Sequence, residues 1–160
     1  MMSSENLESA QAVSARMPKA SCCVLAFSLA FCLLSGCGLR QAKTDSEKVL
    51  ARHFRAVATN GYGAAIADYG AQFFANTTKA EWSNSLAAVS GKLGDYQGYS
   101  VIGWRASKRV GPGGGTYVEL RCRTSYSKYA ADESFTLFKG AGASDYKIVG
   151  HQINSPGLLK

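Results

Sequence analysis

The chain has 160 residues, 46% of them hydrophobic, and carries a formal net charge of +7 at pH 7. This length suffices for a single domain with a hydrophobic core. The excess of basic side chains favours anionic partners. We expect no nucleic-acid partner, because the sequence holds no helix-turn-helix pattern, RNA-binding sheet motif or zinc finger.

An apolar run over residues 20–34 is the first element of the chain. Arg16 and Lys19 precede the run, and Ser35-Gly36-Cys37 follows it. A basic segment, a short apolar segment and small residues at the cleavage point are the parts of an export signal. An uncleaved membrane anchor is the alternative, although the run is shorter than the roughly 18–20 residues that a spanning helix needs.

The cysteine after the small residues makes Leu34-Ser35-Gly36-Cys37 resemble the lipobox of bacterial lipoproteins. The resemblance implies transfer of a diacylglyceryl group to the Cys37 thiol, cleavage before Cys37 and acylation of the new amino terminus. Residues 1–36 would then be a lipoprotein signal peptide, and translation from Met17 would give it a more ordinary beginning. Gly38 after the acylated cysteine resembles the pattern of outer-membrane sorting in Gram-negative bacteria. The expected location is the cell envelope, lipid-anchored at the outer membrane and facing the periplasm.

Signal cleavage would also decide the cysteine chemistry. Cys22, Cys23 and Cys32 would leave with the signal, and Cys37 would be acylated. Cys122 would remain as a single thiol, which can form neither an intramolecular disulfide nor a cysteine zinc site. Because Cys122 lies in an alternating strand pattern, we expect a small buried residue rather than a reactive thiol. We expect no cofactor and no metal ion.

Three helices are expected after a short polar tether at residues 37–44. Thr44-Asp45-Ser46-Glu47 is a capping box that predicts the start of the first helix and of a domain over residues 45–153. Asn60-Gly61 is the expected C-cap of this helix, and a shorter helix follows over residues 62–69. The apolar stripe of the first helix is formed by Leu50, Phe54 and Val57.

The third helix begins at a second capping box, Thr78-Lys79-Ala80-Glu81, and ends at Gly94. Its apolar residues recur at intervals of four, three and four, which is the spacing that helix packing requires. They are Trp82, Leu86, Val89 and Leu93.

Beyond Gly98 the hydrophobic period changes to the two-residue alternation of strands. The clearest alternation runs over residues 116–129, with one face formed by Val118, Leu120, Cys122, Thr124 and Tyr126. Glycine-rich hairpins and turns separate four expected strands, at residues 99–110, 116–129, 135–139 and 146–153. Residues 129–133 are expected to form a turn, and residues 154–160 a loose C-terminal tail.

This order predicts an α+β fold with three N-terminal helices packed on one face of a four-stranded antiparallel sheet. Three motifs resemble small bacterial lipoproteins of uncharacterised function: Thr78-x-x-Glu81-Trp82, Leu93-Gly94 and Tyr146-Lys147-Ile148-Val149-Gly150. Their domain is similar to the nuclear-transport-factor-like (cystatin-like) cone. The resemblance covers residues 45–153 and implies a pocket between sheet and helices, where some members of the class are isomerases or dehydratases.

Catalysis in such a pocket would need a carboxylate base and a donor for a developing oxyanion. The candidate pocket residues are Asp68, Tyr69, Trp82 and Tyr126. The helical stripe, however, turns Asp68 toward water. His53 and His151 do not predict a metal site, because they are far apart in the sequence and no carboxylate lies at ligand spacing. We expect each to be a solvent-edge or a hydrogen-bonded core histidine.

Three functions are compatible with these features. The first is a non-catalytic module, anchored to the membrane through acylated Cys37, that binds an envelope protein or a small hydrophobic ligand. The second is a basic surface for anionic headgroups or wall polymer, and the third is a small-molecule isomerase or lyase. Because no complete catalytic set is recognisable, we expect the first. The basic surface would consist of Arg105, Lys108, Arg109, Arg121 and Arg123.

Overall fold

The computed structural model describes the backbone of residues 21–160 and the side chains of residues 38–160. The chain divides into two units, residues 1–35 and residues 36–160, and the second contains all of the strands that the structure describes. The expected signal peptide over residues 1–36, with the alternative start at Met17, lies outside the described side chains and stays a prediction.

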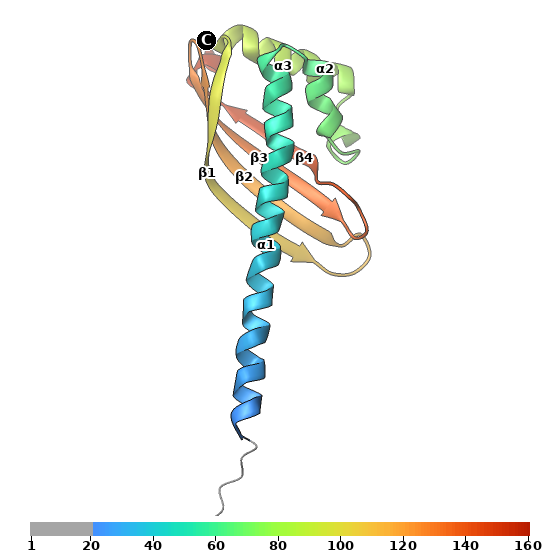
Figure 1. The fold of residues 1–160 in the computed structure, drawn as a ribbon. Coiled ribbons are helices and arrows are strands. Elements are labelled where there is room, and N and C mark those ends of the chain that lie inside the picture. The colour runs from blue at the N-terminus through green and yellow to red at the C-terminus, as the bar shows by residue number, and fades with distance from the viewer. Residues whose placement is uncertain (1–20) are drawn as a thin grey trace, which may run out of the picture. The chain divides into compact units, whose positions relative to one another are not determined.

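The domain has an α+β fold whose helices mostly precede an antiparallel sheet (Figure 1). The helices are α1 (Ser21–Ala58), α2 (Tyr62–Ala65) and α3 (Lys79–Leu93), with 3-10 turns at Ile66–Asp68, Phe73–Ala75 and Pro156–Leu159. The strands are β1 (Tyr96–Arg109), β2 (Gly115–Tyr126), β3 (Ala130–Gly140) and β4 (Lys147–Asn154), and they pair in the order β1-β2-β3-β4.

The first helix does not begin at Thr44, as its capping box predicts. Thr44 lies inside α1, where its hydroxyl donates to the Arg40 carbonyl four residues earlier instead of capping a helix end. The segment expected to be an irregular polar tether is therefore helical from residue 38 onward. Buried Ala42 and Ser46 extend the apolar stripe upstream of Val49, which gives the helix a packing reason to continue.

The start of α3 agrees with the sequence prediction. The Thr78 hydroxyl accepts a hydrogen bond from the Glu81 backbone N–H at 3.1 Å, and the Glu81 carboxylate accepts one from the Thr78 N–H at 2.7 Å. The helix ends at Gly94, whose φ of 91° lies in the left-handed region. A side chain at Gly94 would also collide with Ser127 in the turn between β2 and β3.

Replacing Thr78 by alanine removes the oxygen that caps the Glu81 N–H. We expect the free energy of unfolding to fall by about 1 kcal/mol, as is typical for the loss of an N-cap hydroxyl. Urea unfolding followed by circular dichroism measures this loss. Thr77→Ala is the matched control, since the Thr77 hydroxyl only reaches the Glu81 carboxylate at 3.4 Å and caps no backbone group. Equal losses in the two variants would contradict the capping role.

The alternation predicted for β2 is confirmed. Its inner-face residues are all buried, namely Val118, Leu120, Cys122, Thr124 and Tyr126. The expected turn at residues 129–133 is wrong, because β3 already begins at Ala130 and pairs with β2 along its whole length. Glu133 occupies a buried inner position opposite Cys122. A charged residue on the buried face interrupts the alternation of apolar and polar residues by which a strand is recognised in the sequence.

The C-terminal tail is not loose either. The Ser155 hydroxyl donates to the Ala130 carbonyl and accepts from the Gly157 N–H, which starts a 3-10 turn. Gly157 is buried so close to the Tyr129 ring that a Cβ atom would lie 2.5 Å from it. Leu158 packs against the second core cluster, which contains Leu93.

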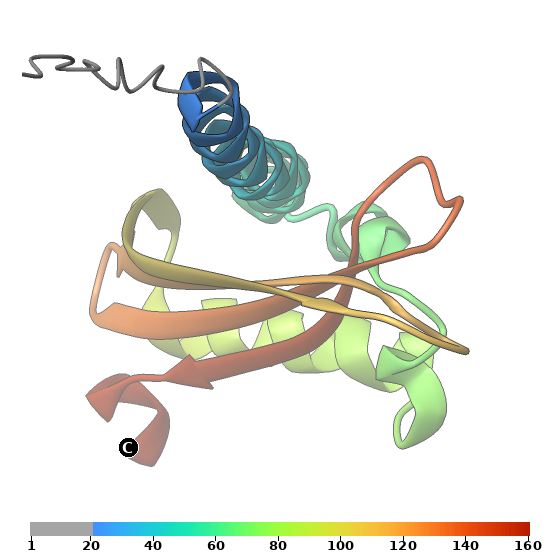
Figure 2. The ribbon, with the colours of Figure 1, turned by 90° about the horizontal axis from the view of Figure 1, so that it is seen from below.

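The core lies between α1 and the inner face of the sheet. Leu50 and Phe54 of α1 share one cluster of buried residues with Leu120, Phe135 and Ile148 of three strands. The end of α3 meets the β2–β3 turn, where Lys128 and Tyr129 donate backbone hydrogen bonds to the Leu93 carbonyl. Leu86 and Trp82, nearer the start of α3, pack on the core cluster that α1 shares with the strands. Figure 2 shows the twist of the sheet and α3 behind it.

Candidate functional site

A chain of four buried polar side chains crosses the interior of the domain. The Glu133 carboxylate on β3 is joined to His151 Nε2 on β4 at 2.9 Å. The other ring nitrogen of His151 is 2.6 Å from the Tyr69 hydroxyl, and the Tyr126 hydroxyl donates to the second oxygen of Glu133 at 3.0 Å. We call Tyr69, His151, Glu133 and Tyr126 the buried polar chain.

The register of β3 and β4 explains how Glu133 and His151 come together. Phe135 is paired with His151 and lies two residues along β3 from Glu133, so the carboxylate and the imidazole are diagonal neighbours on one face. The Phe135 ring stacks on His151 at a centroid distance of 4.0 Å. The side chains of His151 and Glu133 are 0% and 1% exposed.

His53 of α1 lies beside the buried polar chain. Its ring is 5.5 Å from that of His151, edge to face, and its Nδ1 contacts the Ala65 carbonyl at 3.3 Å. The expectation of a hydrogen-bonded core histidine is confirmed for both residues. The sequence did not indicate that the two imidazoles are neighbours, because one comes from a helix and the other from the last strand.

Burial and hydrogen bonding set the protonation of these groups in opposite ways. Burial favours the protonated form of Glu133, but the hydrogen bonds and charge of His151, with the Tyr126 hydroxyl, outweigh it and lower the pKa of Glu133. Burial raises the pKa of both Tyr69 and Tyr126, which keeps the phenols protonated. Burial and repulsion by His151 lower the pKa of His53 to about 4.

The buried polar chain has matched donors and acceptors. When His151 donates from Nε2 to Glu133, its Nδ1 can accept the Tyr69 hydroxyl proton, and Glu133 keeps an oxygen for Tyr126. The buried polar chain can hold the protons of its hydrogen bonds in fixed positions, but packed side chains enclose all of its groups. No cluster of three metal-ligating residues occurs in the part of the chain that the structure describes.

The structure brings together three of the four predicted pocket residues. Tyr69 and Tyr126 belong to the buried polar chain, and the Trp82 ring lies 5.5 Å from that of His151. Asp68 is not part of this cluster. It accepts two hydrogen bonds from the Arg52 guanidinium, the shorter at 2.7 Å.

Sequence analysis missed Glu133 and did not connect it to His151. Glu133 could have been found, because it lies two residues before Phe135 and four before Leu137 and therefore on the same buried face of β3. The inward position of His151, by contrast, does not follow from counting alternate residues along β4. A register shift between the Leu137–Ile148 and Thr136–Gly150 pairs puts His151 on the same face as Ile148 despite their odd spacing.

The five basic residues of the predicted anion-binding surface do not form one patch. Arg105 pairs with Glu119 and Arg123 with Asp132, each at 2.7 Å, so carboxylates on the outer sheet face neutralise two of them. The Arg121 guanidinium lies over Gly103, about 3.1 Å from where a Cβ atom would be. Lys108 and Arg109 lie elsewhere, at the β1–β2 hairpin.

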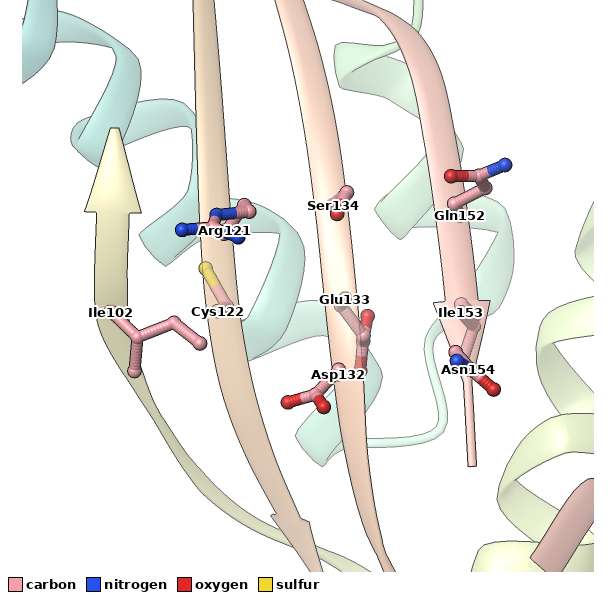
Figure 3. A pocket seen from close by; sticks show the side chains of 9 residues that line it. All are labelled: Ile102, Arg121, Cys122, Asp132, Glu133, Ser134, Gln152, Ile153 and Asn154. Atoms are coloured by element: carbon pink, nitrogen blue, oxygen red, sulfur yellow. The ribbon is translucent and has the colours of Figure 1, made fainter. Parts of the chain in front are cut away.

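Arg121 borders a hollow of about 490 Å³ on the outer face of the sheet. It forms a row across three strands with Ser134 and Gln152, and Figure 3 shows these side chains side by side. Cys122 borders the same hollow, but its side chain belongs to the inner face and is fully buried. Burial raises the pKa of the Cys122 thiol to about 12, as expected for an unreactive core cysteine.

Comparison of the chain with protein-family models, curated protein sequences and solved structures gave no match. The described part of the chain contains no helix with the length and apolar character needed to cross a membrane. Cys37 lies in α1, but its side chain is outside the described ones, so its acylation stays a prediction.

Proposed function

We propose that this protein is a bacterial envelope lipoprotein, held at the outer membrane and facing the periplasm by acylated Cys37. The observation that carries the proposal is the basic and apolar leader that ends in Leu34-Ser35-Gly36-Cys37. Each methylene of the acyl chains that enters the bilayer contributes about 0.8 kcal/mol, so several chains together would anchor the domain stably.

The domain itself we propose to be a non-catalytic binding or accessory module for an envelope protein or a small hydrophobic ligand. Glu133 and His151 are the strongest chemical groups in its interior, and their side chains are at most 1% exposed. They are hydrogen-bonded to each other and to two tyrosines, so a substrate would have to displace packed core residues to reach them. This arrangement supports binding at the surface over an isomerase or lyase reaction inside the domain.

We also propose that the domain is a nuclear-transport-factor-like (cystatin-like) cone. Two features support this assignment. The helices mostly precede the sheet, and the long first helix packs Leu50 and Phe54 against the inner face of a twisted four-stranded antiparallel sheet. The buried polar chain occupies the interior, where the pocket of such a cone would lie.

Acylation at Cys37 is testable by expressing the full chain in a bacterium supplied with radiolabelled palmitate. We expect the wild-type protein to be labelled and to begin at residue 37 by mass spectrometry. Cys37→Ser should abolish the label and leave the precursor uncleaved, because no thiol remains for diacylglyceryl transfer. Cys32→Ser is the matched control, since it removes a cysteine from the apolar run without touching the lipobox, and it should be labelled like wild type.

Two results would overturn the lipoprotein assignment. One is label that persists in the Cys37→Ser variant. The other is a wild-type polypeptide recovered from cells with residues 1–36 still attached, or with an unmodified thiol at its new amino end.

A further inference from the structure

Two hairpins at one end of the sheet bring three basic side chains together. Lys108 and Arg109 end β1, and Lys139 lies at the end of β3, where the three residues line one hollow of about 390 Å³. Among the described residues, no carboxylate pairs with any of them, in contrast to Arg105 and Arg123 on the outer face. We call Lys108, Arg109 and Lys139, with the hairpin residue Val110, the basic hairpin end.

Two of these cations lie over aromatic rings. The Arg109 guanidinium lies 4.7 Å from the centre of the Tyr117 ring, and the Lys139 ammonium lies 5.8 Å from that of Tyr146. Such contacts orient a cation but leave its net charge in place. Val110 projects beyond them and is 94% exposed, although it is a large apolar residue. An exposed apolar tip surrounded by lysine and arginine has the character of a surface that enters a lipid headgroup region.

The basic hairpin end lies close enough to Asp45 of α1 for its charge to act on that carboxylate. The Lys139 charge reaches Asp45 of α1, where it adds to the hydrogen bonds from Lys48 and Gln41 that lower the pKa of Asp45. Cys37 is two helical turns upstream of Asp45, which corresponds to about 12 Å at 1.5 Å per residue.

We propose that the basic hairpin end rests on a bilayer containing anionic phospholipid, next to the acyl chains on Cys37. This inference rests on the proposed lipid anchor and adds an orientation to it. Because α1 is helical from residue 38 into the core, no irregular linker separates the anchor from the domain. The anchor therefore holds the hairpins near the headgroups, and each cation strengthens the contact by roughly fivefold. The Arg121 hollow on the outer sheet face stays available for a partner in the periplasm.

The test uses the acylated protein, extracted in detergent and reconstituted into phosphatidylcholine vesicles with or without phosphatidylglycerol. A nitroxide label on Val110→Cys reports depth through its relative accessibility to oxygen and to a water-soluble nickel reagent. A label on Lys128→Cys, in the β2–β3 turn at the other end of the strands, is the matched control. Cys122 is fully buried and should not react with the label.

We expect the residue 110 label to lie at headgroup depth in vesicles with phosphatidylglycerol, and the residue 128 label to stay in water. The triple variant Lys108→Gln, Arg109→Gln and Lys139→Gln should return the residue 110 label to water. The triple variant Arg105→Gln, Arg121→Gln and Arg123→Gln removes the same net charge from the outer face and should leave the label at headgroup depth.

Several outcomes would overturn the inference. A residue 110 label that stays in water while the protein floats with the vesicles would refute the contact but not the anchor. If both triple variants returned the residue 110 label to water, the net charge of the domain, and not the position of the basic hairpin end, would determine the depth of the label. The same label depth without phosphatidylglycerol would refute the role of anionic lipid. Protein that fails to float with the vesicles would instead contradict the proposed anchor.

Discussion

His151→Leu should lower the free energy of unfolding at pH 7 by roughly 3–5 kcal/mol, the usual cost of leaving a buried carboxylate without its partner. The substitution leaves the Glu133 carboxylate in the core with a hydrogen bond from the Tyr126 hydroxyl at 3.0 Å, and it removes the hydrogen-bond partner of the Tyr69 hydroxyl. Urea unfolding at equilibrium measures the loss.

The pH dependence of this variant gives a second readout. In the wild-type protein the lowered pKa of Glu133 stabilises the fold above pH 4.5, and that contribution is lost as pH falls further. Without His151, burial is the dominant influence and raises the pKa of Glu133. The stability deficit of His151→Leu should therefore be largest at neutral pH and should shrink as the solution is acidified toward pH 4.5.

Glu133→Gln separates the loss of charge from the loss of packing. Added to His151→Leu, it removes the unpaired carboxylate and should raise the stability of the double variant above that of His151→Leu alone. A double variant that is less stable than His151→Leu would contradict a penalty from buried charge. A single His151→Leu variant within about 1 kcal/mol of wild type would contradict the importance of the pair.

Acidification from pH 6.5 to pH 4 should destabilise the wild-type protein by about 3 kcal/mol through His53. Burial and repulsion by His151 lower the pKa of His53 from 6.5 to about 4. Between these values the unfolded chain binds a proton at this residue and the folded domain does not, so stability falls as pH falls. Urea unfolding at a series of pH values measures the slope.

His53→Phe should flatten the dependence on pH between 6.5 and 4, because phenylalanine keeps an aromatic ring in the core but does not titrate. Carboxylates whose pKa is lowered in the fold, such as that of Glu133, still contribute to the slope near pH 4. Arg52→Gln is a control on the same helix, since its loss removes the surface pair with Asp68 and not a buried titration. An unchanged slope in His53→Phe would refute the assignment.

Local sequence patterns determined most of the secondary structure. The capping box at Thr78 predicted the start of α3, because both of its hydrogen bonds form between residues three apart. The alternation along β2 predicted its buried face for a similar reason, since successive side chains of any strand point to opposite sides. The identical pattern at Thr44 failed, because buried residues upstream let the helix continue.

The chemical centre of the domain was decided by tertiary structure. Tyr69 and His151 are 82 residues apart and meet because Tyr69 forms a parallel bridge with Ile148 of β4. A one-residue register shift in β4 turns His151 inward, and pairing of β3 with β2 buries Glu133. No local pattern encodes either event, because register depends on contacts between strands and not on the residues of one strand. The sequence by itself thus determined most of the elements and the α+β fold class and predicted the lipobox, whereas packing assembled the buried polar chain.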